Sequence, residues 1–237
     1  MKKSTMYIIS FIAIIGILLG LINIVKSFSN SSKGDIGKAE ELISKVEMPI
    51  ESDYYGYYYD KKIVKASDLN DKMIILLGIN NIVNNTEEEK DTISKESLKK
   101  SIDSFLLNAK YQDQSISVGK CYGSISEYKD GIYSLKGSCK SNNNEGYMTK
   151  VIKVKETKNK MIVKTKVIYV VYSFKNSKKP VQYVYENADK KKLKAKIKSD
   201  DLLIINKTNR YYKKGKTYNY TFIKEKGNYY FDSVKKG

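Results

Sequence analysis

Two cysteines are the first residues of this sequence whose type and spacing could do chemistry. Cys121 and Cys139 flank two strand-like runs joined by Lys129-Asp130-Gly131. If these three residues form the loop of a hairpin, the sequence numbers of any two residues that face each other across it add up to 260. The sequence numbers of Cys121 and Cys139 also add up to 260. They would then face each other at a separation that a disulfide can bridge. The sequence therefore predicts a Cys121–Cys139 disulfide, with two reduced cysteines as the alternative.

A run of lysines is the second candidate. The residues that would contact a polyanion are Lys190, Lys191, Lys192, Lys194, Lys196 and Lys198. Residues 147–237 carry 25 basic and 7 acidic residues in a chain of net charge +18. Such a field attracts anionic polymers, anionic lipid headgroups or nucleic acid. An AT-rich genome is the alternative explanation for the lysines, but it does not explain why residues 30–146 carry a net charge of −3.

A tyrosine-rich tract at residues 52–60 is the third candidate. Its tyrosines are Tyr54, Tyr55, Tyr57, Tyr58 and Tyr59. They could form a stacking platform for sugars or bases, or they could pack a loop or short strand against a sheet. No basic residue lies inside the tract, which favours the packing interpretation.

Catalytic chemistry has little support in this sequence. There is no histidine, which removes the commonest general base, the commonest metal ligand and every Ser–His or Cys–His nucleophile. The candidate acids on the expected strands are Glu127, Glu156, Glu186 and Asp232. They form no paired-carboxylate motif. We therefore expect no catalytic residue, no metal site and no cofactor.

An apolar run at Tyr7–Val25 positions these residues relative to a membrane. It passes nineteen residues without a charge, enough for a helix to cross one hydrocarbon core. Lys2 and Lys3 precede it and favour a cytoplasmic amino terminus. The alternative is a cleaved signal peptide, for which residues 27–29 form a weak cleavage site.

The domain boundaries follow from this anchor. Residues 1–6 form a cytoplasmic tip, residues 7–25 a single-pass signal anchor and residues 26–34 a small, polar, flexible linker. Residues 35–237 form an extracytoplasmic domain. The expected location is the cell membrane, with the domain outside.

Three helices are predicted at the start of this domain. The first follows Asp35 and ends before Pro49. The second starts at Ser67 and is apolar around much of its circumference. The third is capped by Ser94 and carries apolar residues at helical spacing as far as Ala109.

Strands are predicted from residue 115 onward, where the apolar period changes to two. After the cysteine hairpin, the strands cover residues 147–156, 161–174, 181–185, 217–224 and 229–234. Four lysines on the first two of these would form a basic, solvent-facing stripe: Lys153, Lys155, Lys164 and Lys166. Lysines on an exposed sheet also protect against edge pairing. Residues 200–212 fit either a helix or a strand.

The closing pattern carries a family resemblance. Residues 218–222 and 227–234 read Tyr-Asn-Tyr-Thr-Phe and Gly-Asn-Tyr-Tyr-Phe-Asp-Ser-Val, which is similar to the end of many membrane-anchored extracytoplasmic proteins of low-GC bacteria. The Cys121 hairpin, with Gly137-Ser138-Cys139, also resembles that group. The order of elements resembles NTF2-like and cystatin-like domains. It implies an α+β fold in which three helices pack on a curved antiparallel sheet of about six strands.

The expected function is that of a membrane-anchored binding or scaffold module. Its partners would be the cytoplasmic membrane, through Tyr7–Val25, and an anionic lipid, a wall polymer or an envelope protein. A nucleic-acid-binding envelope protein is one alternative, although the chain has a single arginine, Arg210, for reading bases. An NTF2-like enzyme that uses buried carboxylates is the other.

Overall fold

The fold is mixed α+β, as the sequence predicts. The structure, a computed structural model, describes residues 36–49, 52–85, 91–117, 125–136, 145–173, 181–198, 205 and 209–237. The predicted anchor Tyr7–Val25 lies outside these ranges. Among the described residues, no helix is long and apolar enough to cross a bilayer.

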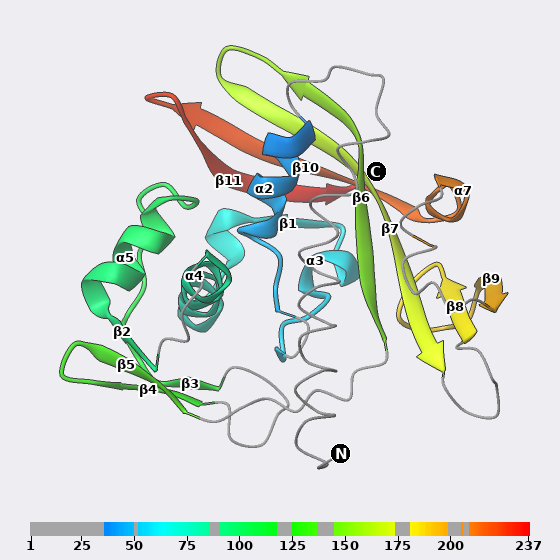
Figure 1. The fold of residues 1–237 in the computed structure, drawn as a ribbon. Coiled ribbons are helices and arrows are strands. Elements are labelled where there is room, and N and C mark those ends of the chain that lie inside the picture. Colours follow the sequence, from blue (N-terminus) through cyan, green and yellow to red (C-terminus); the bar gives the residue numbers. More distant parts are fainter. Residues whose placement is uncertain are drawn as a thin grey trace.

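Two antiparallel sheets organise the chain (Figure 1). The larger has seven strands in the order β1-β11-β10-β7-β8-β9, with β6 also paired to β7. Its strands are β1 (Ile63–Lys65), β6 (Glu145–Glu156), β7 (Lys160–Ser173), β8 (Val181–Tyr185), β9 (Leu193–Lys198), β10 (Lys216–Glu225) and β11 (Asn228–Lys236). The smaller has the order β2-β5-β4-β3, formed by β2 (Thr92–Ser94), β3 (Ile116–Ser117), β4 (Ile125–Lys129) and β5 (Ile132–Lys136).

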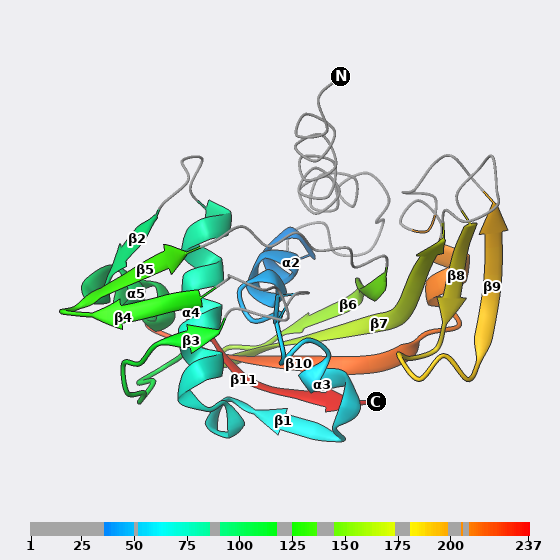
Figure 2. The ribbon, with the colours of Figure 1, turned by 90° about the horizontal axis from the view of Figure 1, so that it is seen from below.

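Helices occupy the space beside and between the sheets. They are α2 (Ile36–Ser44), α3 (Tyr57–Asp60), the 3₁₀ turn η2 (Ala66–Asp68), α4 (Asp71–Asn85), α5 (Lys95–Asp103) and α7 (Asn209–Tyr212). The smaller sheet, α4 and α5 lie at one end of the larger sheet, and β8, β9 and α7 lie at the other (Figures 1 and 2).

The three predicted helices are confirmed, with two differences in their bounds. The second helix was predicted to start at Ser67, but Ser67 lies in η2 and α4 starts at Asp71. Residues 73–79 of α4 are all buried, as its apolar circumference indicates. The hydroxyl of Ser94 accepts a hydrogen bond from the N–H of Ser97 at 3.1 Å and caps α5. However, α5 ends at Asp103 rather than near Ala109. Phe105 and Leu106 stay buried in the turns that follow, so the apolar pattern continues past the helix itself.

The Asp130–Gly131 hairpin differs from the prediction in two ways. It belongs to the smaller sheet, in which β5 pairs with β2 and β4 pairs with β3. Its turn has two residues, both left-handed, with φ of 51° and 81°. Opposed positions such as Tyr128 and Tyr133 therefore sum to 261, not 260.

The register argument for the disulfide is therefore wrong. A two-residue turn shifts one strand by one position relative to the three-residue loop that the argument assumed. Cys121 and Cys139 both lie outside the described residues, so their disulfide stays a prediction without that support.

β7 is the central strand of the larger sheet. Along its length it pairs with β6 on one side. On the other side, residues 160–167 pair with β10 and residues 169–173 pair with β8. Successive side chains of a strand point to opposite faces, so Met161, Val163 and Thr165 enter the core while Lys164 and Lys166 point away from it. We call these two sides the inner face and the outer face.

A second, smaller core lies where β7 meets β8. It contains Ile168, Val170, Val184, Ile197, Ile205, Tyr211 and Tyr212. The last two belong to α7, so part of the segment that fits either a helix or a strand is a single helical turn.

Candidate functional site: a basic sheet face and a tyrosine pocket

The basic stripe predicted from the sequence is confirmed by the strand register. Lys153 on β6 is the direct cross-strand partner of Lys164 on β7, and Lys150 is the partner of Lys166. Lys153, Lys155 and Lys164 are exposed. Like charges directly opposite each other destabilise a sheet, so these pairs cost stability in the free protein.

The stripe extends across four strands. Lys164 is opposite Asn219 of β10, and Asn219 is opposite Lys235 of β11. The neighbouring outward residues of β10, Thr217 and Thr221, are small and polar. The outer face of these strands is thus a basic surface, exposed at Lys153, Lys155, Lys164 and Lys235, with half-buried hydrogen-bonding groups along its centre.

Acidic residues on the same strands do not neutralise this stripe. Glu156 is opposite Met161, a core residue. Its carboxylate bonds to the Lys224 ammonium at 3.0 Å and accepts from the Tyr229 hydroxyl, and these bonds lower the pKa of Glu156. No described acidic residue forms an ion pair with Lys153, Lys155 or Lys164.

Lys150 and Lys166 are held more tightly than the rest of the stripe. The Lys166 ammonium donates to the Gly215 carbonyl at 3.0 Å. The Lys150 ammonium lies 5.4 Å from the ring centroid of Tyr212 on α7. Burial lowers the pKa of Lys150, and the charge of Glu40 opposes this effect.

The densest lysine run lies elsewhere and is partly neutralised. Its ion pairs with described acids are Lys190 with Glu145 at 2.5 Å, Lys194 with Glu186 at 2.9 Å and Lys192 with Glu186 at 3.9 Å. Lys191, Lys196 and Lys198 form no ion pair with a described residue.

The run and the stripe do not form one surface. Lys196 is opposite Tyr183, which is opposite Val171 on β7. By the alternation of β7, Val171 is on the inner-face side and the stripe lysines are on the outer. The structure therefore separates the two groups of lysines.

The tyrosine tract packs against the larger sheet, so the packing interpretation is confirmed. It forms the one-turn helix α3 rather than a loop or short strand. The ring centroids of Tyr59 and Tyr147 are 4.5 Å apart, and those of Tyr58 and Phe231 are 5.9 Å apart. Offset and edge-to-face pairs at these distances are favourable.

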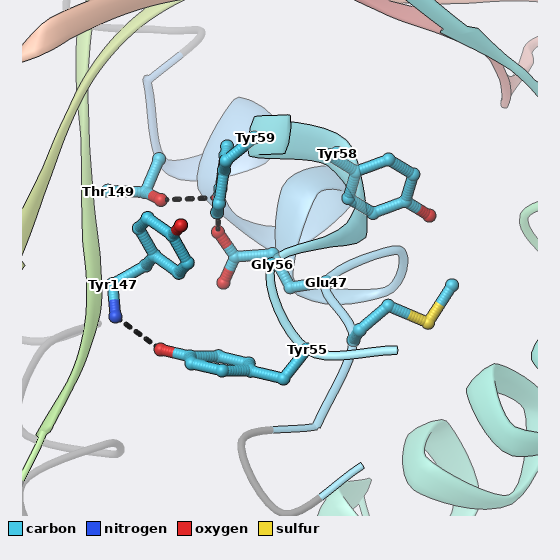
Figure 3. Close-up of a pocket in the computed structure, with 8 residues that line it drawn as sticks. Glu47, Tyr55, Gly56, Tyr58, Tyr59, Tyr147 and Thr149 are labelled. Atoms are coloured by element: carbon cyan, nitrogen blue, oxygen red, sulfur yellow. Dashed lines mark hydrogen bonds between the residues drawn. The ribbon is translucent and has the colours of Figure 1, made fainter. Parts of the chain in front are cut away.

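A small pocket lies between this tract and β6 (Figure 3). Its volume is about 30 Å³. Three segments contribute to its lining. They are Glu47, just after α2; Tyr55 and Tyr59 of the tract; and Tyr147 and Thr149 of β6. The Tyr55 hydroxyl accepts from the backbone N–H of Tyr147 and ties the tract to the edge of β6.

The Tyr59 hydroxyl is the centre of the polar contacts in this pocket. It lies 3.3 Å from Glu47 Oε1, 2.9 Å from Thr149 Oγ1 and 3.1 Å from the Tyr220 hydroxyl. Burial raises the pKa of Glu47, while the hydrogen bonds from Thr149 and Tyr59 oppose that rise. Burial also raises the pKa of Tyr59 and keeps its hydroxyl neutral.

Glu47 is the residue that sequence reasoning missed. It stands between the buried Val46 and Met48 just before Pro49, and a lone acid at a helix end carries no motif. None of the candidate acids Glu127, Glu156, Glu186 and Asp232 lines the pocket. In the described part of the chain, no three acidic or cysteine side chains gather as metal ligands.

Comparisons with protein-family models, with curated proteins and with solved structures find no match to this chain.

Proposed function

We propose that this chain is a membrane-anchored binding module whose outer sheet face binds an anionic polymer of the cell envelope. The observation that carries the proposal is the direct pairing of Lys153 with Lys164, whose side chains are both exposed. A like-charge pair of this kind costs up to about 1 kcal/mol. A bound polyanion would remove that repulsion.

The shape of the surface favours an extended ligand. The basic residues follow β6 and β7 and continue across β10 to Lys235 on β11. Lysine ammonium groups act as point charges without the fixed geometry of arginine. Such a surface suits a flexible chain of repeated negative charges, and its binding should weaken as salt screens the charges.

The anchor and the location belong to the same proposal. Tyr7–Val25 would hold the chain in the cytoplasmic membrane as a single-pass anchor, and residues 35–237 would lie outside. We also propose the finer fold assignment, an NTF2-like or cystatin-like arrangement.

A binding role is favoured over catalysis by the size of the tyrosine pocket. Its 30 Å³ accommodates about two water molecules, and among the described residues Glu47 is the one carboxylic acid that lines it. General acid–base chemistry on an organic substrate would need more room.

The test compares two triple variants of the full chain in a neutral detergent. The first replaces Lys153, Lys155 and Lys164 by Gln. The second, a matched control, replaces Lys191, Lys196 and Lys198 by Gln, so both remove three lysines without a described ion pair. Binding of a fluorescent glycerol-phosphate polymer is measured at low and at physiological salt.

We expect the first variant to lose at least tenfold in affinity and the control to stay within about threefold. Equal losses in the two variants would contradict a specific role for the outer face. Tighter binding of phosphatidylglycerol vesicles or single-stranded DNA than of the polymer would reassign the ligand to a lipid or a nucleic acid.

Topology is tested separately by adding protease to intact cells. The proposal expects residues 35–237 to be digested from outside. Protection of this domain until the cells are lysed would place it in the cytoplasm and overturn the location.

A further inference from the structure

The pocket beside Glu47 is not part of the basic outer face. Thr149 of β6 is opposite Val167 of β7, a core residue, so the pocket lies on the inner face. The Glu47 carboxylate has two hydroxyl partners, Tyr59 and Thr149. No described lysine or arginine forms an ion pair with it. Glu47 is half-buried, and a carboxylate partly removed from water without a counter-charge is costly.

Aromatic rings surround this carboxylate. In Figure 3, Tyr55, Tyr59 and Tyr147 stand on three sides of Glu47. The face of an aromatic ring carries partial negative charge. Such rings do not offset the charge of a carboxylate, but they attract a cation, as the carboxylate also does.

The hydroxyl contacts leave carboxylate lone pairs open. Tyr59 has one proton and two acceptor lone pairs. Thr149 also has one proton, so the two hydroxyls can give the Glu47 carboxylate at most two hydrogen bonds. A carboxylate has about four acceptor sites, so sites remain after the hydroxyl donors are counted.

We infer that this pocket binds a small monovalent cation, either a potassium or ammonium ion or the ammonium head of a primary amine. Glu47 supplies the counter-charge and the tyrosine rings supply cation–π contacts. The cavity of about 30 Å³ admits a group close to water in size. It excludes tetramethylammonium, whose methyl groups make it several times larger.

The test measures the melting temperature of the full chain in a neutral detergent. Methylammonium chloride or potassium chloride replaces tetramethylammonium chloride stepwise at constant ionic strength. A ligand at ten times its Kd should raise the Tm of a domain of this size by about 3–6 °C. We expect a saturable rise with at least one of the two small cations. A rise with methylammonium alone assigns the amine head, and an equal rise with potassium assigns the bare ion.

The variant Glu47→Gln keeps the shape of the side chain and removes its charge. It should abolish the cation-dependent rise, whereas Glu41→Gln, a neighbouring exposed acid on α2, should retain it. A Tm that does not depend on the cation in the wild type, or a rise that survives Glu47→Gln, overturns the inference.

A second readout needs no variant. The chain has 21 tyrosines and no tryptophan, so its near-ultraviolet difference spectrum reports on tyrosine environments. A cation among Tyr55, Tyr59 and Tyr147 should give a saturable spectrum with methylammonium or potassium. The lack of any such spectrum in the wild type also overturns the inference. Neither readout involves the outer face, so this inference and the proposed function succeed or fail separately.

Discussion

Lys153 and Lys164 are direct cross-strand neighbours on β6 and β7. Both side chains are exposed, and neither forms an ion pair with a described acid. From Lys164 the same row continues through Asn219 to Lys235, on strands spaced about 4.8 Å apart. A row of this kind costs stability, so replacing one lysine should affect stability and binding in opposite directions.

The variant Lys164→Glu tests this opposition. A glutamate opposite Lys153 replaces repulsion by attraction, so we expect the free energy of unfolding to rise by about 0.5–1 kcal/mol. Affinity for the glycerol-phosphate polymer should fall several-fold, because a negative charge enters the binding face. Urea unfolding and polymer binding measure the two effects on the same preparation.

The control for this variant is Lys110→Glu, which makes the same charge change on an exposed residue outside the two strands. It should leave the free energy of unfolding within about 0.5 kcal/mol of wild type and keep most of the polymer affinity. A loss of stability in Lys164→Glu would show that the lysine pair is not repulsive.

Glu40 on α2 predicts a specific dependence of stability on pH. Burial raises its pKa from the ordinary 4.5 to about 7, and the charge of Lys150 opposes the rise. The folded state therefore holds this proton more tightly than the unfolded state. The stabilisation is complete below about pH 4.5 and is lost as the pH rises through 7.

The variant Glu40→Gln should remove this loss. Because Glu40 is partly exposed, we expect a gain of only about 1–2 kcal/mol over wild type at pH 8 and little difference at pH 4.5. Urea unfolding between about pH 4.5 and pH 8 measures this difference in the free energy of unfolding. The control is Glu41→Gln, since Glu41 is exposed and forms an ion pair with Lys45 at 2.7 Å. A constant difference between Glu40→Gln and wild type at every pH would contradict the assignment.

Periodicity predicted the parts of this fold that one stretch of sequence determines. The cap at Ser94, the buried circumference of α4 and the alternation of β7 are all local patterns, and the structure has each of them. The basic stripe also followed from alternation, since it needs only the facing of two adjacent strands. The Lys226–Gly227 turn between β10 and β11 is equally local.

Features that depend on distant segments were not predictable in the same way. A change of one residue in the Asp130–Gly131 turn altered every cross-strand pair of that hairpin. Glu145 neutralises Lys190 across 45 positions of sequence, and no local pattern indicates such a pair. The Glu47 pocket needs α2, α3 and β6 to meet, so its residues share no motif.

The Cys121–Cys139 disulfide remains a prediction that can be checked directly. If the bond forms, alkylation of the unfolded chain without reductant should leave both cysteines unmodified, and both should react after reduction. Intact-mass spectrometry measures the two states. Closing this 19-residue loop should stabilise the fold by about 3 kcal/mol. Full alkylation before reduction would show that the cysteines are free.

Gly56 and Gly131 have the same backbone conformation, so comparing their alanine variants separates the cost of backbone strain from the cost of a steric contact. Gly56 and Gly131 have φ of 84° and 81°, so an alanine at either position meets the left-handed backbone penalty of about 1–2 kcal/mol. At Gly131 an added Cβ has nothing within 4 Å. At Gly56 it would lie 2.8 Å from Cε2 of Tyr147. We therefore expect Gly56→Ala to cost about 1–3 kcal/mol more than Gly131→Ala.

A double-mutant cycle assigns that extra cost to one contact. In a Tyr147→Ala background the ring that the new Cβ meets is gone, so the added cost of Gly56→Ala should shrink towards that of Gly131→Ala. Urea unfolding of the single and double variants measures the coupling. Equal costs for the two glycine variants would mean that the ring moves aside freely, and the tyrosine tract would then not be held tightly against β6.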